Sequence, residues 1–162
     1  IAQGYSVDLV AAFLSSKGVV NYMVEIGGEV TAKGINSKGK TWRIGIERPV
    51  EGSSIGEHGF QNIISLDNKS LATSGNYRKF KNINGKKVSH TIDPLTGFSV
   101  DNNLLSVSVI TDYAADADAL ATSFMVMGLD SSIKFINEYN DTTIKVYFIY
   151  DSLGDFKEWS SF

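Results

Sequence analysis

Cysteine is absent from this sequence of 162 residues. Disulfide bonds, thiolate metal sites and catalysis by a cysteine nucleophile are therefore excluded. Proline is also scarce, with two residues against fifteen glycines. This ratio favours tight turns and close backbone approaches, and it argues against a proline-rich linker.

An excess of positive charge and long apolar runs are missing as well. The formal net charge is −3 and no basic run occurs, so nothing in the charge supports nucleic-acid binding. No apolar run approaches the roughly 20 residues that a membrane-spanning helix needs. The Walker A, dinucleotide, nucleophile-elbow and HExxH patterns are also absent. A hydrophobic fraction of 43% is ordinary, and the length suits one domain over residues 1–162.

The apolar periodicity predicts an α+β fold with a largely antiparallel sheet and packed helices. Two expected hairpins join 62–67 to 70–74 and 143–150 to 155–159, and Asn84-Gly85 marks a further turn. The first three strands are expected to form a meander. Helices are predicted at Tyr5–Ser16, Ala114–Gly128 and Ser131–Tyr139, the last of them capped near Asp130 or Ser131. Strands are predicted at Val19–Ile26, Glu29–Lys33, Thr41–Glu47, Asn62–Asp67, Ser70–Ser74, Val88–Ile92, Leu104–Thr111, Thr143–Tyr150 and Asp155–Trp159.

The helix predicted at Ala114–Gly128 carries Asp118 and Thr122, four residues apart. This spacing places a carboxylate and a hydroxyl on one helix face, one turn apart. Hard cations such as Mg2+ bind oxygen ligands of this kind. Such a pair is also common as a plain solvated or capping pair, and the helix alone does not decide between the two interpretations.

Two further segments hold candidate site residues. His90 is expected where a strand meets the turn at Asp93, a position from which an imidazole could accept a proton from a hydroxyl. A structural histidine bonded to that turn is the alternative. The run from Ala72 to Arg78 combines hydroxyls, Gly75 and backbone amides that could hold phosphate oxygens, or simply end a hairpin. His58, in a glycine-flanked loop, is expected to be exposed without a functional role.

Taken in order, five segments resemble the ApbE-type flavin transferases, described as FAD:protein FMN transferases and formerly as thiamine-biosynthesis lipoproteins. The segments are IAQGYSVD, VNYMVEIGGEV with TWRIGIERP, SLATSGNYR, SHTIDPLTG and ADALATSFMVMG. The resemblance covers residues 1–128. It implies a T-fold-related domain, and a Mg2+-dependent transfer of FMN from FAD to a threonine or serine hydroxyl of a partner flavoprotein, with release of AMP.

The resemblance also implies roles for individual residues. The metal would be held by Asp118, Thr122 and the carbonyl of Ala2, and His90 would be the general base. Acceptor proteins of the family carry a D-x-x-[ST]-G-A-T type segment. Contacts to FAD are implied for Gln3, Asp8, Gly28, Glu29, Ser74, Gly75, His90 and Ile92.

This sequence departs from the family in two respects. Gln3 replaces the lysine of the family's A-K-G segment, so a cation near the phosphates is lost. Family members are also roughly twice as long, and the chain begins at Ile1 without methionine. We therefore expect a C-terminal portion of a periplasmic, lipid-anchored protein whose N-terminal half is missing here. An FAD-hydrolysing enzyme giving FMN and AMP, or an inactive flavin-binding fragment, are the competing interpretations.

Overall fold

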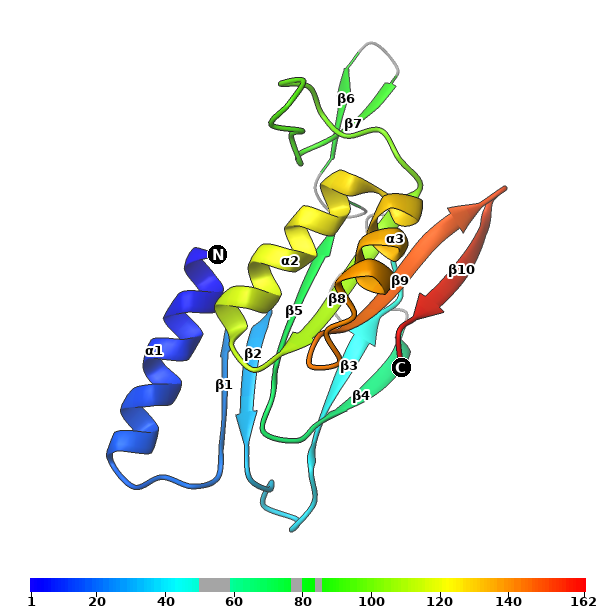
Figure 1. Cartoon of the computed structure of the whole chain (residues 1–162). Helices are drawn as coiled ribbons and strands as arrows, with labels where there is room; N and C mark the ends of the chain where they lie inside the picture. Colours follow the sequence, from blue (N-terminus) through cyan, green and yellow to red (C-terminus); the bar gives the residue numbers. More distant parts are fainter. Residues whose placement is uncertain (50–58, 77–79, 84–85) are drawn as a thin grey trace.

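The computed structural model describes residues 1–49, 59–76, 80–83 and 86–162 (Figure 1). Three helices and ten strands are present in these ranges. The helices are α1 (Ala2–Ser16), α2 (Ala114–Met127) and α3 (Leu129–Tyr139); the strands are β1 (Tyr22–Ile26), β2 (Glu29–Lys33), β3 (Trp42–Glu47), β4 (Phe60–Leu66), β5 (Ser70–Gly75), β6 (Phe80–Ile83), β7 (Lys86–Ser89), β8 (Leu104–Thr111), β9 (Lys145–Ser152) and β10 (Asp155–Ser160).

Six strands form the main sheet in the order β1-β2-β5-β8-β9-β10, and every neighbouring pair is antiparallel. Two separate ribbons, β3–β4 and β6–β7, are also antiparallel. The predicted α+β class with a largely antiparallel sheet is therefore confirmed. No helix in the described ranges has the length and apolar character that a membrane crossing would require.

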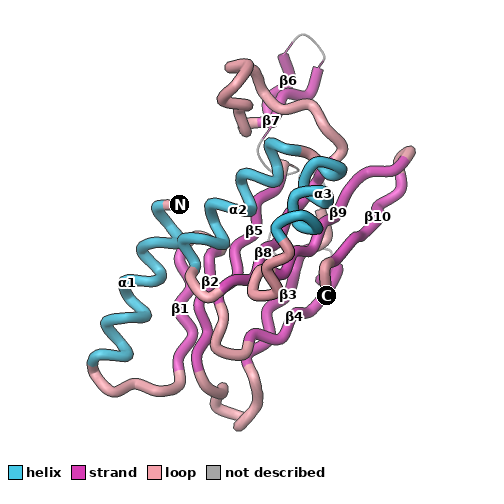
Figure 2. The backbone as a smooth tube through the Cα atoms, viewed as in Figure 1, coloured by secondary structure: helices cyan, strands magenta, loops and turns pink. Residues whose placement is uncertain are grey.

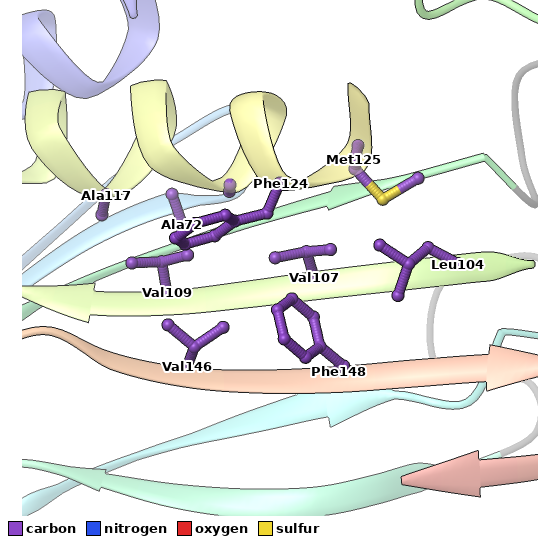
Figure 3. Packing of buried hydrophobic residues seen from close by; sticks show 10 residues of the cluster. Ala72, Leu104, Val107, Val109, Ala117, Phe124, Met125, Val146 and Phe148 are labelled. Atoms are coloured by element: carbon purple, nitrogen blue, oxygen red, sulfur yellow. The ribbon is translucent and has the colours of Figure 1, made fainter. Parts of the chain in front are cut away.

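Alternation along the strands gives the main sheet two buried faces. One face carries Val107, Val109 and Phe148, which pack under Phe124 of α2 (Figure 3). The other face carries residues one position away, such as Ile110, and packs against the β3–β4 ribbon. Leu104–Thr111 was predicted with its correct bounds, and its leucine, valine and isoleucine residues supply both faces, with Ser106 and Ser108 buried among them.

The helices share one side of the main sheet, and α1 lies beside α2 near β1 (Figures 1 and 2). Val7 and Ala11 are buried against Val24 of β1 and Ala114 of α2. Gly4 allows the closest approach, because a Cβ added there would stand 2.6 Å from the carbonyl carbon of Ala114. The small residues of both helices thus bring the N-terminal turn of α1 against the start of α2.

Two predicted strand pairings are wrong. Residues 62–67 and 70–74 do not form a hairpin: β4 pairs with β3, whereas β5 pairs with β2 and β8. The meander is wrong for the same reason, since β3 leaves the main sheet after β2. A turn signal such as Asp67-Asn68 fixes where the chain reverses, but the partner of each strand depends on which apolar face must be covered.

Several boundaries also differ from the prediction. Helix α1 begins three residues earlier than Tyr5, and β1 begins at Tyr22. Helix α3 begins at Leu129 with Gly128 as its N-cap and no side-chain cap, so neither Asp130 nor Ser131 caps it. The predicted strand 88–92 ends at Ser89 in β7, and Ile92 instead forms an isolated bridge with Ser99.

The helix at 114–128 and the terminal hairpin of β9 and β10 are confirmed. The expected Asn84-Gly85 turn and the prediction for His58 lie outside the described residues.

Candidate active site

A cavity of about 630 Å³ lies where α1, α2, the β1–β2 turn, the β3–β4 ribbon and β5 meet. This volume falls in the range of small-molecule and cofactor sites. The described residues that line it are Gln3, Glu25, Gly27, Gly28, Glu29, Val30, Ile44, Gly45, Ile46, Glu47, Phe60, Leu71, Thr73, Ser74, Gly75, His90, Thr91, Asp118 and Thr122.

The helix face that carries Asp118 and Thr122 forms one wall of this cavity. The Oδ2 atom of Asp118 accepts the backbone N–H of Gly4 at 3.0 Å and lies 2.7 Å from the nitrogen of Ile1. All contacts of Asp118 within the described residues go to Oδ2, so Oδ1 remains available to a ligand. One turn further, Thr122 Oγ1 lies 3.1 Å from Ser74 Oγ of β5. A buried carboxylate and two hydroxyls therefore stand together at the cavity.

Glu29, the first residue of β2, adds a second buried carboxyl group to the cavity. Only 8% of the residue is exposed, and its Oε2 atom has no hydrogen-bonding partner among the described residues. Burial raises the pKa of Glu29 above its ordinary value of 4.5, and the negative charges of Asp118 and Glu25 raise it further. A buried acidic oxygen without a partner is costly unless a ligand completes its interactions.

Gln3 and Gly27 fit together beside this carboxyl group. Gly27 has a φ of +68°, and a Cβ added there would overlap Gln3 Nε2 and stand 2.8 Å from Gln3 Cδ. The same position is 3.4 Å from Glu29 Oε2. Gly27 therefore combines a left-handed turn with the space for the Gln3 amide. The residue that replaces the family's lysine thus stands close to the unpartnered acidic oxygen.

His90 lines the cavity from the segment that follows β7. The backbone around it is held by hydrogen bonds: Ser89 Oγ donates to Asn76 Oδ1 at 2.7 Å, and Thr91 N–H donates to Ser89 Oγ at 3.0 Å. Gly75, at the end of β5, belongs to the same wall. An imidazole on a braced segment next to a cavity is suited to proton transfer with a bound molecule.

Three predicted site residues do not line the cavity. The carboxylate of Asp8 accepts the backbone N–H groups of Ala114 at 2.8 Å and Ala115 at 2.9 Å, so it caps the start of α2. The carbonyl of Ala2 accepts the hydroxyl of Ser6 within α1. Ile92 is exposed beyond His90. The remaining predicted residues are brought together, from segments far apart in the sequence.

Sequence reasoning missed the wall supplied by the β3–β4 ribbon. The ring of Phe60 covers Gly45 so closely that a Cβ on Gly45 would overlap it. Phe60 is 59% exposed and also lines the cavity, so it offers an apolar surface to a ligand. The alternation of Ile44 and Ile46 indicated a strand, but no local signal indicated that this strand turns towards Asp118.

The donor set of the cavity suits a hard divalent cation. Asp118 and Thr122 offer oxygen atoms one helical turn apart, and the buried Oε2 of Glu29 lacks a partner among the described residues. No three His, Asp or Glu side chains gather as a metal cluster in the described ranges. A cation here would therefore take part of its ligands from a bound molecule or water, as Mg2+ commonly does at phosphate sites.

Fold and cavity together define a class: an α+β domain with an oxygen-rich ligand site between two closely packed helices and one end of an antiparallel sheet. The family model described as "ApbE family" matches residues 1–148. The chain therefore belongs to the ApbE family, and the resemblance seen in the sequence is confirmed.

Curated relatives agree with this membership. The chain is 43% identical over 161 residues to a Vibrio cholerae protein named FAD:protein FMN transferase, and 41% identical over 149 residues to one from Haemophilus influenzae. It is covered to 99% and 92% in these comparisons but spans only 46% and 41% of the two relatives. The chain thus corresponds to less than half the length of these relatives.

Solved structures show the same fold. The flavin transferase ApbE from Vibrio cholerae superimposes with a TM-score of 0.83 at 41% identity, covering 99% of this chain and 48% of the other. The apo flavinyl transferase ApbE from Pseudomonas stutzeri gives a TM-score of 0.82 at 35% identity, covering 99% and 47%. The described fold is therefore that of ApbE proteins.

Proposed function

We propose that this chain carries the catalytic residues of an FAD:protein FMN transferase that depends on Mg2+. The observation that supports the proposal most strongly is the meeting of Asp118, Thr122, Ser74 and His90 at one cavity. The names of the relatives add the substrate class: FAD as the donor and a protein as the acceptor. The acceptor would carry a D-x-x-[ST]-G-A-T type segment that presents the hydroxyl.

The proposed reaction moves the FMN group as a phosphodiester. The acceptor hydroxyl oxygen attacks the phosphorus on the FMN side of the FAD diphosphate. The new O–P bond forms as the anhydride bond breaks, and AMP leaves with the electron pair of that bond. His90 accepts the hydroxyl proton, which makes the acceptor oxygen a better nucleophile.

The remaining residues position and neutralise the diphosphate. Asp118 and Thr122 would hold Mg2+ with ligands from FAD and water, and the ion would offset the negative charge of the diphosphate. The hydroxyl of Ser74 lies close enough to Thr122 to share that role. The backbone at Gly28 and Gly75 allows close approach of a flat or charged ligand, and Gln3 supplies amide hydrogen bonds in place of a cation.

The resemblance supports an extracytoplasmic, periplasmic location with a lipid anchor. Membrane attachment would come only from that anchor. The activity test therefore uses the full-length protein that its gene encodes.

The test incubates the protein with FAD, Mg2+ and an acceptor protein that carries the D-x-x-[ST]-G-A-T type segment. We expect flavin fluorescence that stays on the acceptor in a denaturing gel, together with release of AMP. Asp118→Asn should reduce transfer by about 100-fold or more, because a charged metal ligand becomes neutral. Asp116→Asn is the matched control, because Asp116 is an exposed carboxylate on the same helix and outside the cavity.

His90→Ala should reduce transfer by about 100- to 10,000-fold, the usual contribution of a general base, while FAD still binds. Free FMN without labelled acceptor would favour the FAD-hydrolysing enzyme instead. An inactive unmodified protein, or normal transfer in both variants, would refute the proposal.

A further inference from the structure

Glu29 is a buried acidic residue of the cavity to which the proposed reaction gives no catalytic role. Only 8% of Glu29 is exposed, and its Oε2 atom has no hydrogen-bonding partner among the described residues. Other carboxylates near the cavity are satisfied: Glu25 accepts the N–H of Gly28 at 3.1 Å, and Asp118 accepts that of Gly4. Among the described residues, Glu29 Oε2 is the carboxylate oxygen that is both fully shielded from solvent and without a hydrogen bond.

Such a group is costly in the absence of a ligand. Removing a carboxylate from water without a hydrogen-bonding or charged partner costs several kcal/mol, and a neighbouring carboxylate adds repulsion. Here the electrostatic influence of Asp118 raises the pKa of Glu29 in addition to burial. A ligand that brings positive charge between the two groups would remove both penalties.

The surroundings of Glu29 favour a compact cation as the ligand. Glu29 and Asp118 line the same cavity, and the Gln3 amide stands near Glu29 beside Gly27. Amide groups cannot neutralise an acid. A divalent ion with oxygen ligands fits two carboxylates and a hydroxyl better than a large organic cation does.

We propose that Glu29 is a second carboxylate of the cation site, contacting either the ion held by Asp118 and Thr122 or one of its water ligands. This inference rests on the proposed function, because it concerns the same ion. It makes Glu29 a positioning residue that sets the charge and placement of the cation. Its acidic oxygen comes from β2, so the ion would link the main sheet to α2.

The experiment measures binding of Mn2+, a paramagnetic substitute for Mg2+, by electron paramagnetic resonance, with and without saturating FAD. Glu29→Gln keeps the shape of the side chain and removes its charge. We expect its Mn2+ affinity to fall by about 10- to 100-fold, the usual effect of losing a supporting ligand contact. Asp116→Asn removes the same formal charge from an exposed group outside the cavity, and its affinity should change by less than about twofold.

Thermal unfolding supplies a second readout, which can be measured both without metal and with Mn2+. Without metal, Glu29→Gln should raise Tm by about 2–4 °C, because the variant no longer buries an acidic group without a partner. Adding Mn2+ should stabilise the unmodified protein more than the variant.

Gln3→Lys leaves Glu29 in place and introduces an ammonium group beside its Oε2. We expect weaker Mn2+ binding in this variant, because the ammonium competes with the ion for the same carboxylate. It tests the inference even if Glu29→Gln does not fold.

The outcomes separate this inference from the proposed function. If Asp118→Asn loses Mn2+ binding while Glu29→Gln and Gln3→Lys bind it as the unmodified protein does, the inference is overturned and the proposed function stands. If Glu29→Gln weakens FAD binding without any change for Mn2+, Glu29 contacts the nucleotide directly and the inference is again overturned. An unmodified protein that binds no Mn2+, with or without FAD, overturns both.

Discussion

The two ends of α2 are built in opposite ways. Its C-terminal half inserts Phe124 into an aromatic core, where the ring meets Phe135 at 5.9 Å and Phe148 at 6.0 Å, both edge to face. Its N-terminal half meets α1 through glycine, alanine and two aspartates, with few large side chains. The apolar end contributes stability through buried area, whereas the polar end aligns groups for a ligand.

The difference explains where the cavity lies. Large side chains fill the space between the C-terminal half of α2 and the main sheet, and of that half only Thr122 is among the described residues that line the cavity. Small side chains at the other end let the backbones approach, and the carboxylates of Asp8 and Asp118 take over the bonding between the helices. Four substitutions test this contrast, from the largest expected effect on stability to the smallest.

Phe124→Ala should give the largest loss. The ring is 1% exposed, and removing a buried phenylalanine costs about 3–5 kcal/mol of the free energy of unfolding. Urea unfolding followed by circular dichroism measures the loss. Phe13→Ala is the control, because that ring on α1 is 59% exposed and should contribute less than about 0.5 kcal/mol. Equal losses for the two variants would contradict the contrast between the two ends.

Gly4→Ala should destabilise the protein by about 1–3 kcal/mol through overpacking. In an unconstrained helix the same change stabilises by about 0.5–1 kcal/mol, so the sign of the effect is informative. The added Cβ would stand 2.9 Å from Ala115 Cα, and neither backbone can move without disturbing the bond to Asp118. The urea midpoint and the Mn2+ affinity should both fall; an increase in stability would show that the helices are not in close contact.

Asp8→Ala should cost about 0.5–2 kcal/mol, the value of a helix cap. This variant also decides between two roles for Asp8. If the residue only caps α2, FAD affinity should change little once the protein is folded. If Asp8 contacts FAD, as the resemblance implies, affinity should fall while Asp8→Asn, which keeps one accepting oxygen, retains most of the stability. Calorimetric titration with FAD, alongside urea unfolding, separates the two.

The smallest effect concerns the pH dependence of stability. Folding raises the pKa of Glu29, so the folded chain holds a proton that the unfolded chain releases above about 4.5. The free energy of unfolding should therefore fall as the pH rises through this window, with Asp118 and Glu25 as the carboxylates around the group. Glu29→Gln should lose this slope in metal-free buffer, whereas Glu25→Gln should keep it. An unchanged slope in Glu29→Gln would assign the pH dependence to other groups.

Local elements were predictable because their signals are local. Six of the eight residues of Leu104–Thr111 are leucine or β-branched, and the alanine-rich segment from Ala114 has high helix propensity. Pairing was not predictable, since β5 finds its partners 31 to 41 residues away at Ser106–Thr111. The chain reversal between β4 and β5 carries hairpin signals, yet the two strands separate. Strand β5 joins the main sheet, whereas β4 joins the ribbon that packs against one face of that sheet.

The candidate site shows the same division. The spacing of Asp118 and Thr122 follows from helix geometry, and this pair was predictable from the sequence. That Ser74 reaches Thr122, and that Glu29 lies buried without a partner, depends on how β2 and β5 meet α2 in the folded chain. The role of Asp8 at the start of α2 involves residues 106 positions apart, and no local pattern indicates it.

The bond from the Gly4 N–H to Asp118 Oδ2 makes one backbone amide a spectroscopic sensor of the cavity. The chemical shift of an amide proton depends on the charge of the oxygen that accepts it. A ligand that draws negative charge away from Asp118 should therefore shift the Gly4 resonance, even though Gly4 itself touches no ligand. Occupancy of the site could thus be followed in solution from a single glycine signal, without a flavin chromophore or an acceptor protein.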